Sequence, residues 1–443
     1  MNNDYLIKQK PSYALLLFSL PIIIGNLFQQ TYTMADSAIV GRFVGEQALA
    51  AVGASYSLTN IFICIAFGGG VGCSVIVSRY FGAKDYVRMK TAVYTAMLSF
   101  LAVSLLLGGA GLFLSRSIMA ALNTPEDALG LAAEYLNIYF LGLPFLFMYN
   151  VLSSMFNALG KSRIPLYFLI FSSLFNVALD MVAVTKLNMG IAGAAWATLI
   201  AQGISAALSF AVFLNVINKL CSRKAPLFSP GELKRMTRIA LPSILQQSTV
   251  SIGMMLVQSA VNGFGSQALA GFSAAARIES ICIVPMLGIG NALSSYTAQN
   301  IGAGKYERVR EGYRAATKMV AVSAALIFVT VELLYTPIIK LFLGESGTEA
   351  AVSAGEGYLR FIGAFFCLIG FKASADGILR GAGDMLMFTA ANLVNLFIRV
   401  TLSITLAPIA GIEIIWYSIP IGWFANWIIS YMQYRTGKWR RIT

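Results

Sequence analysis

The sequence contains little charge and no histidine. Only 12% of its 443 residues are Asp, Glu, Lys or Arg, whereas soluble proteins carry about 25%. The absence of histidine excludes histidine metal ligands and histidine proton relays. This composition does not fit an ordinary water-soluble domain.

Cysteine is also scarce, and the five cysteines do not form the pattern of a disulfide framework. No CxxC pair occurs, and Cys221 lies in a basic connector. The other four lie in apolar runs: Cys64, Cys73, Cys282 and Cys367. The sequence therefore does not predict a disulfide-stabilised scaffold.

Long apolar runs dominate what is present. Hydrophobic residues make up 58% of the chain, and runs able to cross about 30 Å of hydrocarbon as helices recur along its length. Lipid offers the backbone no hydrogen bonds, so such runs predict helices. We predict an all-α polytopic membrane protein with twelve spans, roughly 12–38, 50–78, 91–114, 134–158, 163–185, 190–217, 236–262, 272–298, 315–343, 354–378, 385–407 and 412–433.

The start of the chain and the basic residues predict the topology. The first ten residues, "MNNDYLIKQK", are polar, and the run after them lacks a small-residue cleavage site, so we expect a retained first span. Most of the 32 Lys and Arg residues fall on the side that holds the N-terminus. The positive-inside rule then predicts a multi-pass protein of the cytoplasmic membrane with both termini in the cytoplasm. The net charge of +13 is thus explained by topology, and no nucleic-acid partner is expected.

The chain repeats itself at an offset of about 220 residues. Four pairs of segments match: "SLPII" at 19–23 with "ALPSI" at 240–244, "GRFVGEQALAAVG" at 41–53 with "NGFGSQALAGFSA" at 262–274, "FGAKDYVR" at 81–88 with "IGAGKYER" at 301–308, and "GIAGAAW" at 190–196 with "GIEIIW" at 411–416. We predict an N-terminal six-helix lobe at 1–218, a basic connector at 219–238 and a C-terminal six-helix lobe at 239–443. Transporters built from such parallel repeats hold their substrate between the halves.

Residues 174–181, "LFNVALDM", place an amide and a carboxylate inside an apolar run. Asn176 and Asp180 are four residues apart, so they share one helix face. An ionised Asp at the bilayer centre costs about 2.5–3.5 kcal/mol, so it needs a partner or a function. Two interpretations stay open: the pair joins neighbouring helices by hydrogen bonds, or it binds a cation.

The paired motifs resemble those of the MATE (multidrug and toxic compound extrusion) transporters over essentially the whole chain. The N-terminal half is similar to the DinF-like branch, whose members bind the coupling cation, sodium or proton, through an aspartate on span one, an Asn-x-x-x-Asp on span five and a threonine on span six. The resemblance assigns these roles to Asp36, Asn176, Asp180 and Thr198. The NorM-like branch has a glutamate on span seven, and "LPSILQQSTVSIGMM" contains no acid.

The predicted depths of these four residues are compatible with a single site. On the predicted spans, all four fall in the outer half of the N-terminal lobe. Tyr32 and Gln29 lie one and two turns before Asp36 on the same helix face. We expect Gln29 and Tyr32 to line the substrate cavity; simple packing is the alternative for both.

Two further features bear on the mechanism. Pro21 lies inside the first span, where a missing hydrogen bond predicts a kink that links ion binding to the cavity; a static proline is the alternative.

In the C-terminal lobe the acids are absent, because Ser403 falls opposite Asp180 and Ser418 opposite Thr198. Lys372 and Asp376, four residues apart, are expected to form an internal ion pair, and Asp376 is also a candidate substrate contact.

The sequence thus predicts a secondary active exporter of bulky, cationic or amphipathic organic compounds. Inward flux of H⁺ or Na⁺ would drive export by alternating access, without a cofactor and with no metal except Na⁺ at the coupling site. We expect a monomer whose partners are its small-molecule substrates and membrane lipid. One alternative is a flippase for lipid-linked precursors, whose cavity would be basic. The other, an intramembrane prenyl transferase, would need clustered acids for magnesium, and the sequence lacks such a cluster.

Overall fold

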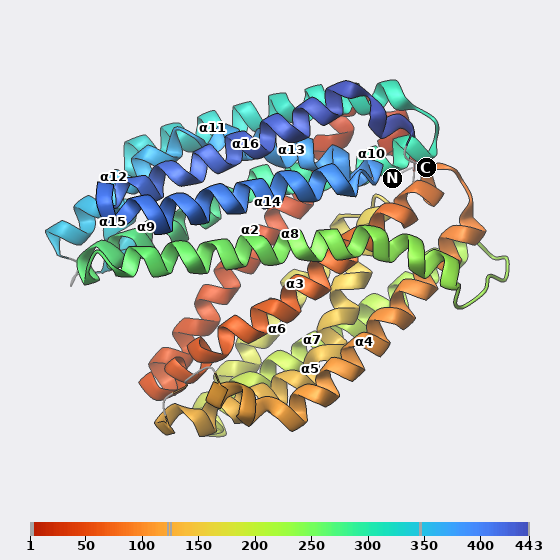
Figure 1. Cartoon of the computed structure of the whole chain (residues 1–443). Coiled ribbons are helices and arrows are strands. Elements are labelled where there is room, and N and C mark those ends of the chain that lie inside the picture. Colours follow the sequence, from red (N-terminus) through yellow and green to blue (C-terminus); the bar gives the residue numbers. More distant parts are fainter. Residues whose placement is uncertain (1–3, 122–123, 125, 345–347, 442–443) are drawn as a thin grey trace. The chain divides into compact units, whose positions relative to one another are not determined.

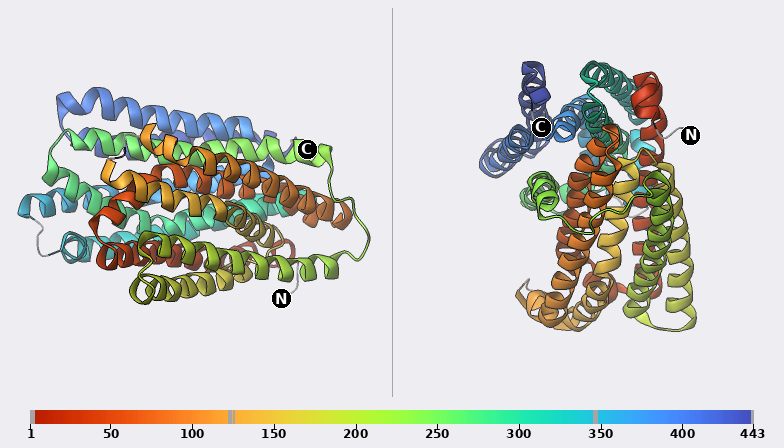
Figure 2. Two further views of the ribbon diagram at one scale, coloured as in Figure 1. Left: turned by 90° about the horizontal axis from the view of Figure 1, so that it is seen from below. Right: turned by 90° about the vertical axis from the view of Figure 1, so that its right-hand side faces the viewer.

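The computed structural model describes residues 4–121, 124, 126–344 and 348–441. Within them the chain forms two compact units. Unit 2 is Ile24–Ile244, and unit 1 comprises the described residues up to Ile23 and from Leu245 onward. Figure 1 and Figure 2 show that each unit consists of long helices lying side by side. The prediction of an all-α chain is confirmed for the described residues.

Unit 2 contains the site described below. Its core lies where α3, α5 and α7 pack together, around Ala51, Phe140 and Ala194. Its elements are the later part of α2 (Pro11–Phe43), α3 (Glu46–Gly82), α4 (Tyr86–Ala121), α5 (Glu126–Ala158), α6 (Arg163–Met181), the π-helical turn η1 (Val182–Lys186), α7 (Gly190–Leu220) and the first part of α8 (Pro230–Asn262).

Unit 1 is built in the same way, with α10 packed on α13, α9 on α12 and α14 on α16. Its elements are α1 (Tyr5–Lys8), the first part of α2, the later part of α8, α9 (Ser266–Cys282), α10 (Val284–Gly302), α11 (Tyr306–Leu343), α12 (Glu349–Gly363), α13 (Phe366–Ala382), α14 (Met385–Thr401), the π-helical turn η2 (Leu402–Leu406), α15 (Ala407–Ala410), α16 (Glu413–Thr436) and the 3₁₀ turn η3 (Lys438–Arg441).

The backbone repeats along with the sequence. A π-helical turn occurs at Val182–Lys186 and again at Leu402–Leu406. Gly45 and Gly265, which precede the second helix of each half, have φ of 110° and 96°, a region that favours glycine. These matched irregularities support the duplication inferred from the sequence.

Both α2 and α8 contribute residues to the two units, and each changes unit two residues after a proline, Pro21 or Pro242. The first part of α8 packs so tightly on α3 that a Cβ at Gly72 would lie 2.4 Å from Ala240 Cα. Such close approach through small residues is common between membrane helices. The boundaries of these two units differ from those of the predicted lobes, 1–218 and 239–443. The division into these lobes stays a prediction.

In the part of the chain that the structure describes, ten helices are long and apolar enough to cross a membrane. The count rises to eleven if α12 and α13, which are bent by 50° at their junction, form one broken span. The helix α16 covers the twelfth predicted span but is not among these helices. The predicted number of twelve is therefore not established.

Candidate functional site

The candidate cation site lies within unit 2, where α2, α6 and α7 bring their polar side chains together. Asp36 and Tyr32 come from α2, Asn176 and Asp180 from consecutive turns of α6, and Thr198 from α7. Directly after Asp180 the α-helix ends at Met181 and gives way to the π-helical turn η1. Such turns are often found at functional sites.

Asn176 connects three of these residues. With the amide turned so that its nitrogen faces acceptors and its oxygen faces donors, Nδ2 donates to Asp180 Oδ2 at 2.9 Å and to the Tyr32 hydroxyl at 2.8 Å. The Asn176 oxygen then accepts from the backbone N–H of Thr198 at 3.0 Å and from its hydroxyl at 3.2 Å. The amide thereby fixes Asp180 against the two neighbouring helices.

The two acids contact each other. The Asp36 and Asp180 carboxyl groups are within hydrogen-bonding distance of one another. Asp180 is 0% exposed, and among the described residues neither Asp36 Oδ1 nor Asp180 Oδ1 has a hydrogen-bond donor. No ion pair in the described structure includes either acid. Buried negative charge without a basic partner is strongly unfavourable, so a proton or a metal cation is needed for both carboxyls to be stable together.

Two tyrosines complete the surroundings of the acids. The Tyr32 hydroxyl also lies close to the Thr198 side chain. Tyr135, on α5, lies within electrostatic reach of both Asp36 and Asp180. Tyr135 was not predicted from the sequence, where its position near the outer end of span four was the only signal for it.

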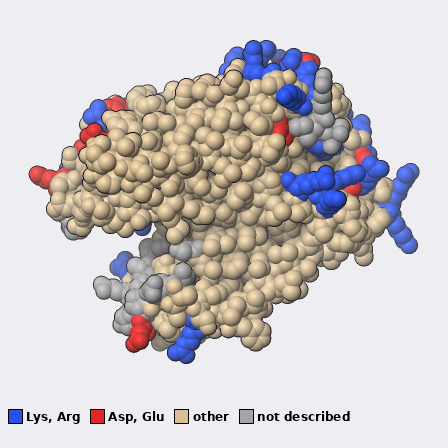
Figure 3. All heavy atoms as spheres, viewed as in Figure 1, with Lys and Arg blue, Asp and Glu red and all other residues tan. Residues whose placement is uncertain are grey.

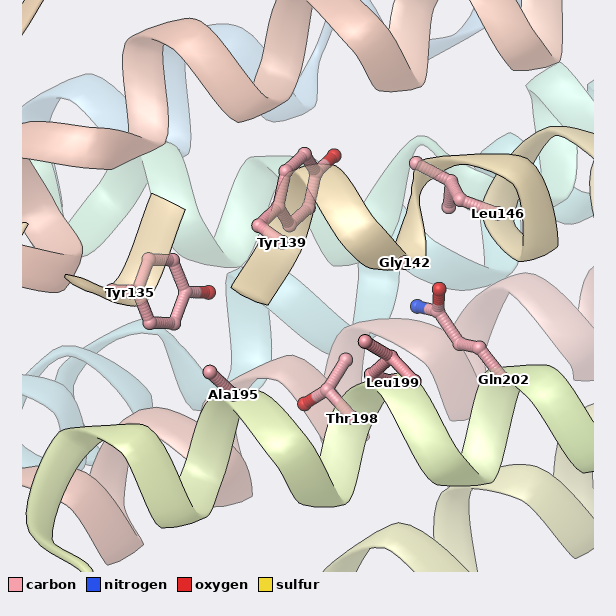
Figure 4. Close-up of a pocket in the computed structure, with 8 residues that line it drawn as sticks. All are labelled: Tyr135, Tyr139, Gly142, Leu146, Ala195, Thr198, Leu199 and Gln202. Atoms are coloured by element: carbon pink, nitrogen blue, oxygen red, sulfur yellow. The ribbon is translucent and has the colours of Figure 1, made fainter. Parts of the chain in front are cut away.

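A small, partly open pocket lies next to the site, between α5 and α7 of unit 2. Figure 4 shows Tyr135 and Tyr139 on α5 across from Thr198 and Gln202 on α7. The remaining lining residues are Gly142, Leu146, Ala195 and Leu199. Thr198 thus takes part in the hydrogen bonds of the candidate cation site and also lines this pocket.

The structure does not group every predicted residue with this site. Gln29 is exposed and does not line the cavity, and Pro21 is buried in the part of α2 that belongs to unit 1. The helix α2 continues through Pro21. The roles predicted for Gln29 and Pro21 stay predictions.

Asp376 lies in unit 1, inside a buried polar network. The predicted ion pair is confirmed, since Lys372 Nζ lies 3.1 Å from Asp376 Oδ2. Asn392 Nδ2 also donates to this oxygen at 3.3 Å, and the Ser430 hydroxyl donates to Oδ1 at 2.8 Å. Both oxygens of Asp376 already accept hydrogen bonds from the protein, so a substrate would have to compete with them.

The positions in unit 1 that correspond to the cation site have different chemistry. Ser403 and Ser418 face each other at 3.3 Å, where the first repeat has Asp180 and Thr198. Nearby, Tyr358 donates to Glu279 at 2.5 Å, and Arg399 lies within electrostatic reach of Glu279. Glu279, on α9, was not predicted from the sequence. Here a protein guanidinium accompanies the acid, unlike at Asp36 and Asp180.

The described residues contain no group of three or more His, Cys, Asp or Glu side chains placed to hold a metal ion. The site in unit 2 offers two carboxylates, one amide oxygen and the hydroxyls of Thr198 and Tyr32. This donor set suits a proton, or Na⁺ as a hard cation with oxygen ligands.

Comparisons with known proteins agree in their result. The family model MatE matches residues 21–182 and 242–405. The chain is 32% identical over 430 residues to the probable multidrug resistance protein YpnP of Bacillus subtilis, covering 97% of this chain and 96% of YpnP. It is 26% identical to the probable multidrug resistance protein YoeA of the same organism, covering 98% of this chain and 96% of YoeA.

Solved structures give the same answer. A MATE crystal structure in the bent conformation matches with a TM-score of 0.90 and 25% identity, covering 99% of this chain and 97% of the other. An outward-facing MATE transporter matches with a TM-score of 0.89 at 23% identity, which supports the fold alone. The relatives are transporters and not enzymes, and this chain belongs to the MatE family of multidrug and toxic compound extrusion transporters.

Proposed function

We propose that this protein exports bulky organic compounds, cationic or amphipathic, across the cytoplasmic membrane in exchange for an inward-moving cation. The observation that carries the proposal is the pair of contacting acids, Asp36 and Asp180, without a basic partner among the described residues. A site of this kind changes its net charge when it gains or loses a cation. Relatives named multidrug resistance proteins support the substrate class.

A proton is the coupling ion that we favour over Na⁺. Two carboxyl groups can form a hydrogen bond with each other only when one of them carries a proton. Two acids close together in a buried site discourage each other's ionisation and so hold a proton readily. Na⁺ would instead require Asp36, Asp180 and the oxygens of Asn176 and Thr198 to converge as ligands.

Export then proceeds by alternating access. A cation can shift the balance between inward-open and outward-open states only if it binds one state more tightly than the other. We infer that protonation of the Asp36–Asp180 pair changes the hydrogen bonds from α6 to α2 and α7, and so biases that balance. Both termini lie in the cytoplasm in this proposal, and the monomer is the working unit.

Efflux by Asp36→Asn in cells tests the proposal. Asparagine keeps the size of the side chain but cannot exchange a proton, so we expect efflux of a fluorescent cation to fall to background. The control is Asp85→Asn, which removes the charge of a half-buried acid paired with Arg88 and should leave efflux unchanged. Wild-type efflux from a well-expressed Asp36→Asn variant would disprove the assigned role.

A further inference from the structure

Three arginines gather at one end of unit 1. Arg310 and Arg314 lie one turn apart near the start of α11, and Arg435 lies near the end of α16. All three are exposed and within electrostatic reach of the Tyr434 hydroxyl. Figure 3 shows Lys and Arg side chains concentrated where α11 begins and α16 ends. Like charges placed together repel one another, so this arrangement favours an anion between them.

The protein itself supplies only part of the balancing charge. Glu307 lies 3.3 Å from Arg310 and 3.1 Å from Arg440. Arg314 and Arg435 have neither an ion pair nor a hydrogen-bond acceptor among the described residues. Two guanidinium groups therefore remain available to an external anion.

Aromatic side chains hold Tyr434 in place beneath these arginines. Its ring centroid lies 4.6 Å from that of Tyr313 and 6.1 Å from that of Trp439, which is stacked on it at 16°. Trp439 is buried and donates from Nε1 to the Tyr434 carbonyl at 2.9 Å. Aromatic residues with one polar end are typical of the membrane–water interface.

In the other repeat, hydrogen-bond acceptors from the protein itself surround the cation at the matching position. Lys90 of unit 2 precedes Arg310 by about 220 residues, the offset of the repeat. The Lys90 ammonium is buried and donates to Asn218 Oδ1 and to the Cys221 carbonyl, each at 3.0 Å. In unit 2 the end of α7 and the connector thus supply the acceptors for the cation at this position, whereas Arg310 in unit 1 is exposed and has Glu307 as its partner.

We propose that Arg310, Arg314, Arg435 and Tyr434 bind the phosphate of an anionic lipid headgroup. Guanidinium groups recognise phosphate by paired hydrogen bonds, and basic sites between helices on the cytoplasmic side bind such headgroups. A lipid is favoured over a free phosphate because both helices carry exposed apolar side chains farther along, such as Val322 and Leu326 on α11 and Phe424 on α16. Acyl chains can pack there while the headgroup contacts the arginines.

The experiment titrates the purified full-length protein with lipid and measures thermal unfolding and binding by native mass spectrometry. Short-chain phosphatidylglycerol is the test ligand, phosphatidylcholine of the same chain length is the zwitterionic control without net charge, and glycerol 3-phosphate is the soluble phosphate. We compare the wild type with Arg314→Gln/Arg435→Gln. The matched control is Arg223→Gln/Lys224→Gln, which removes the same charge from exposed connector residues of unit 2.

We expect phosphatidylglycerol, and neither of the other compounds, to raise the Tm of the wild type. The affinity for it should fall about 30-fold in Arg314→Gln/Arg435→Gln and change little in the connector variant. Equal losses in both double variants would show that net charge alone attracts the lipid and would overturn the proposal. Stabilisation by glycerol 3-phosphate would overturn it in favour of a soluble phosphate. An equal response to phosphatidylcholine, whose headgroup has a phosphate but no net charge, would overturn the assignment of an anionic headgroup.

Discussion

At the scale of single residues, the internal acids Asp180 and Asp376 differ in what balances their charge. Asp376 has Lys372 as its partner at 3.1 Å, together with Asn392 and Ser430. Asp180 has the neutral Asn176 amide and a second acid, Asp36. A buried carboxylate that is paired with a basic side chain contributes to the structure, whereas a buried carboxylate without such a partner is available to an exchangeable cation.

Asn176 and Asp180 should behave as one functional group. If both bind the ion together with Asp36, the loss of transport in Asn176→Ala/Asp180→Asn should be about as large as that in Asp180→Asn alone. Independent contacts would instead give losses that add, because sites that share no partner are usually additive. Transport measured against pH and Na⁺ for both single variants and the double variant decides between them, and additive losses would reduce the pair to a contact between helices.

The Lys372–Asp376 pair should act on stability. Lys372→Met leaves Asp376 buried without its counter-ion, and we expect unfolding to become easier by about 3–5 kcal/mol. Lys372→Met/Asp376→Leu, which removes both charges, should recover much of that loss. Thermal unfolding in detergent measures both. If the stable double variant still exports its substrate, Asp376 is not a substrate contact; if export is lost although the protein is folded, the predicted contact is retained.

At the scale of elements, α2 and α8 are the helices that belong to both units. Each changes unit two residues after a proline, and the two prolines occupy matching places in the repeat. A proline inside a helix removes one backbone hydrogen bond and so makes bending at that point easier. Pro21 and Pro242 therefore mark the points where we expect these helices to flex during transport.

Pro21→Ala and Pro242→Ala test this expectation. Alanine restores the missing hydrogen bond and stiffens the helix, so each variant should lower the rate of transport while the apparent affinity for the coupling ion stays the same. The double variant should be slower than either single variant. Pro144, inside α5 and wholly within unit 2, supplies the matched control, since Pro144→Ala should have the smaller effect on the transport rate. Similar rates in all three single variants would contradict a special role for α2 and α8.

At the scale of the whole molecule, the sequence predicted the architecture better than it predicted the contacts. The helical class follows from apolar runs that admit no other structure in lipid, and the duplication follows from paired motifs. The number of spans did not follow so readily, because α16 is less apolar than the others and α12–α13 is broken.

The candidate site, too, was predicted only in part from the sequence. The spacing of Asn176 and Asp180 placed both on one helix face, and the family resemblance supplied Asp36 and Thr198. Tyr135 and Glu279 were missed because a tyrosine near a helix end, or one acid in a long span, carries no local pattern. Only the packing of α5 on α7, and of α9 on α12, shows what these two side chains contact.

The central claim is that cation coupling resides in the N-terminal repeat alone. The most direct measurement is counterflow of a fluorescent organic cation in liposomes, with a pH gradient and a Na⁺ gradient imposed separately, for the wild type, Thr198→Ala and Ser418→Ala. We predict that the pH gradient drives wild-type transport, that Thr198→Ala weakens this dependence, and that Ser418→Ala, at the matching place in the second repeat, leaves it unchanged. Equal losses in the two variants, or wild-type transport driven by neither gradient, would contradict the claim.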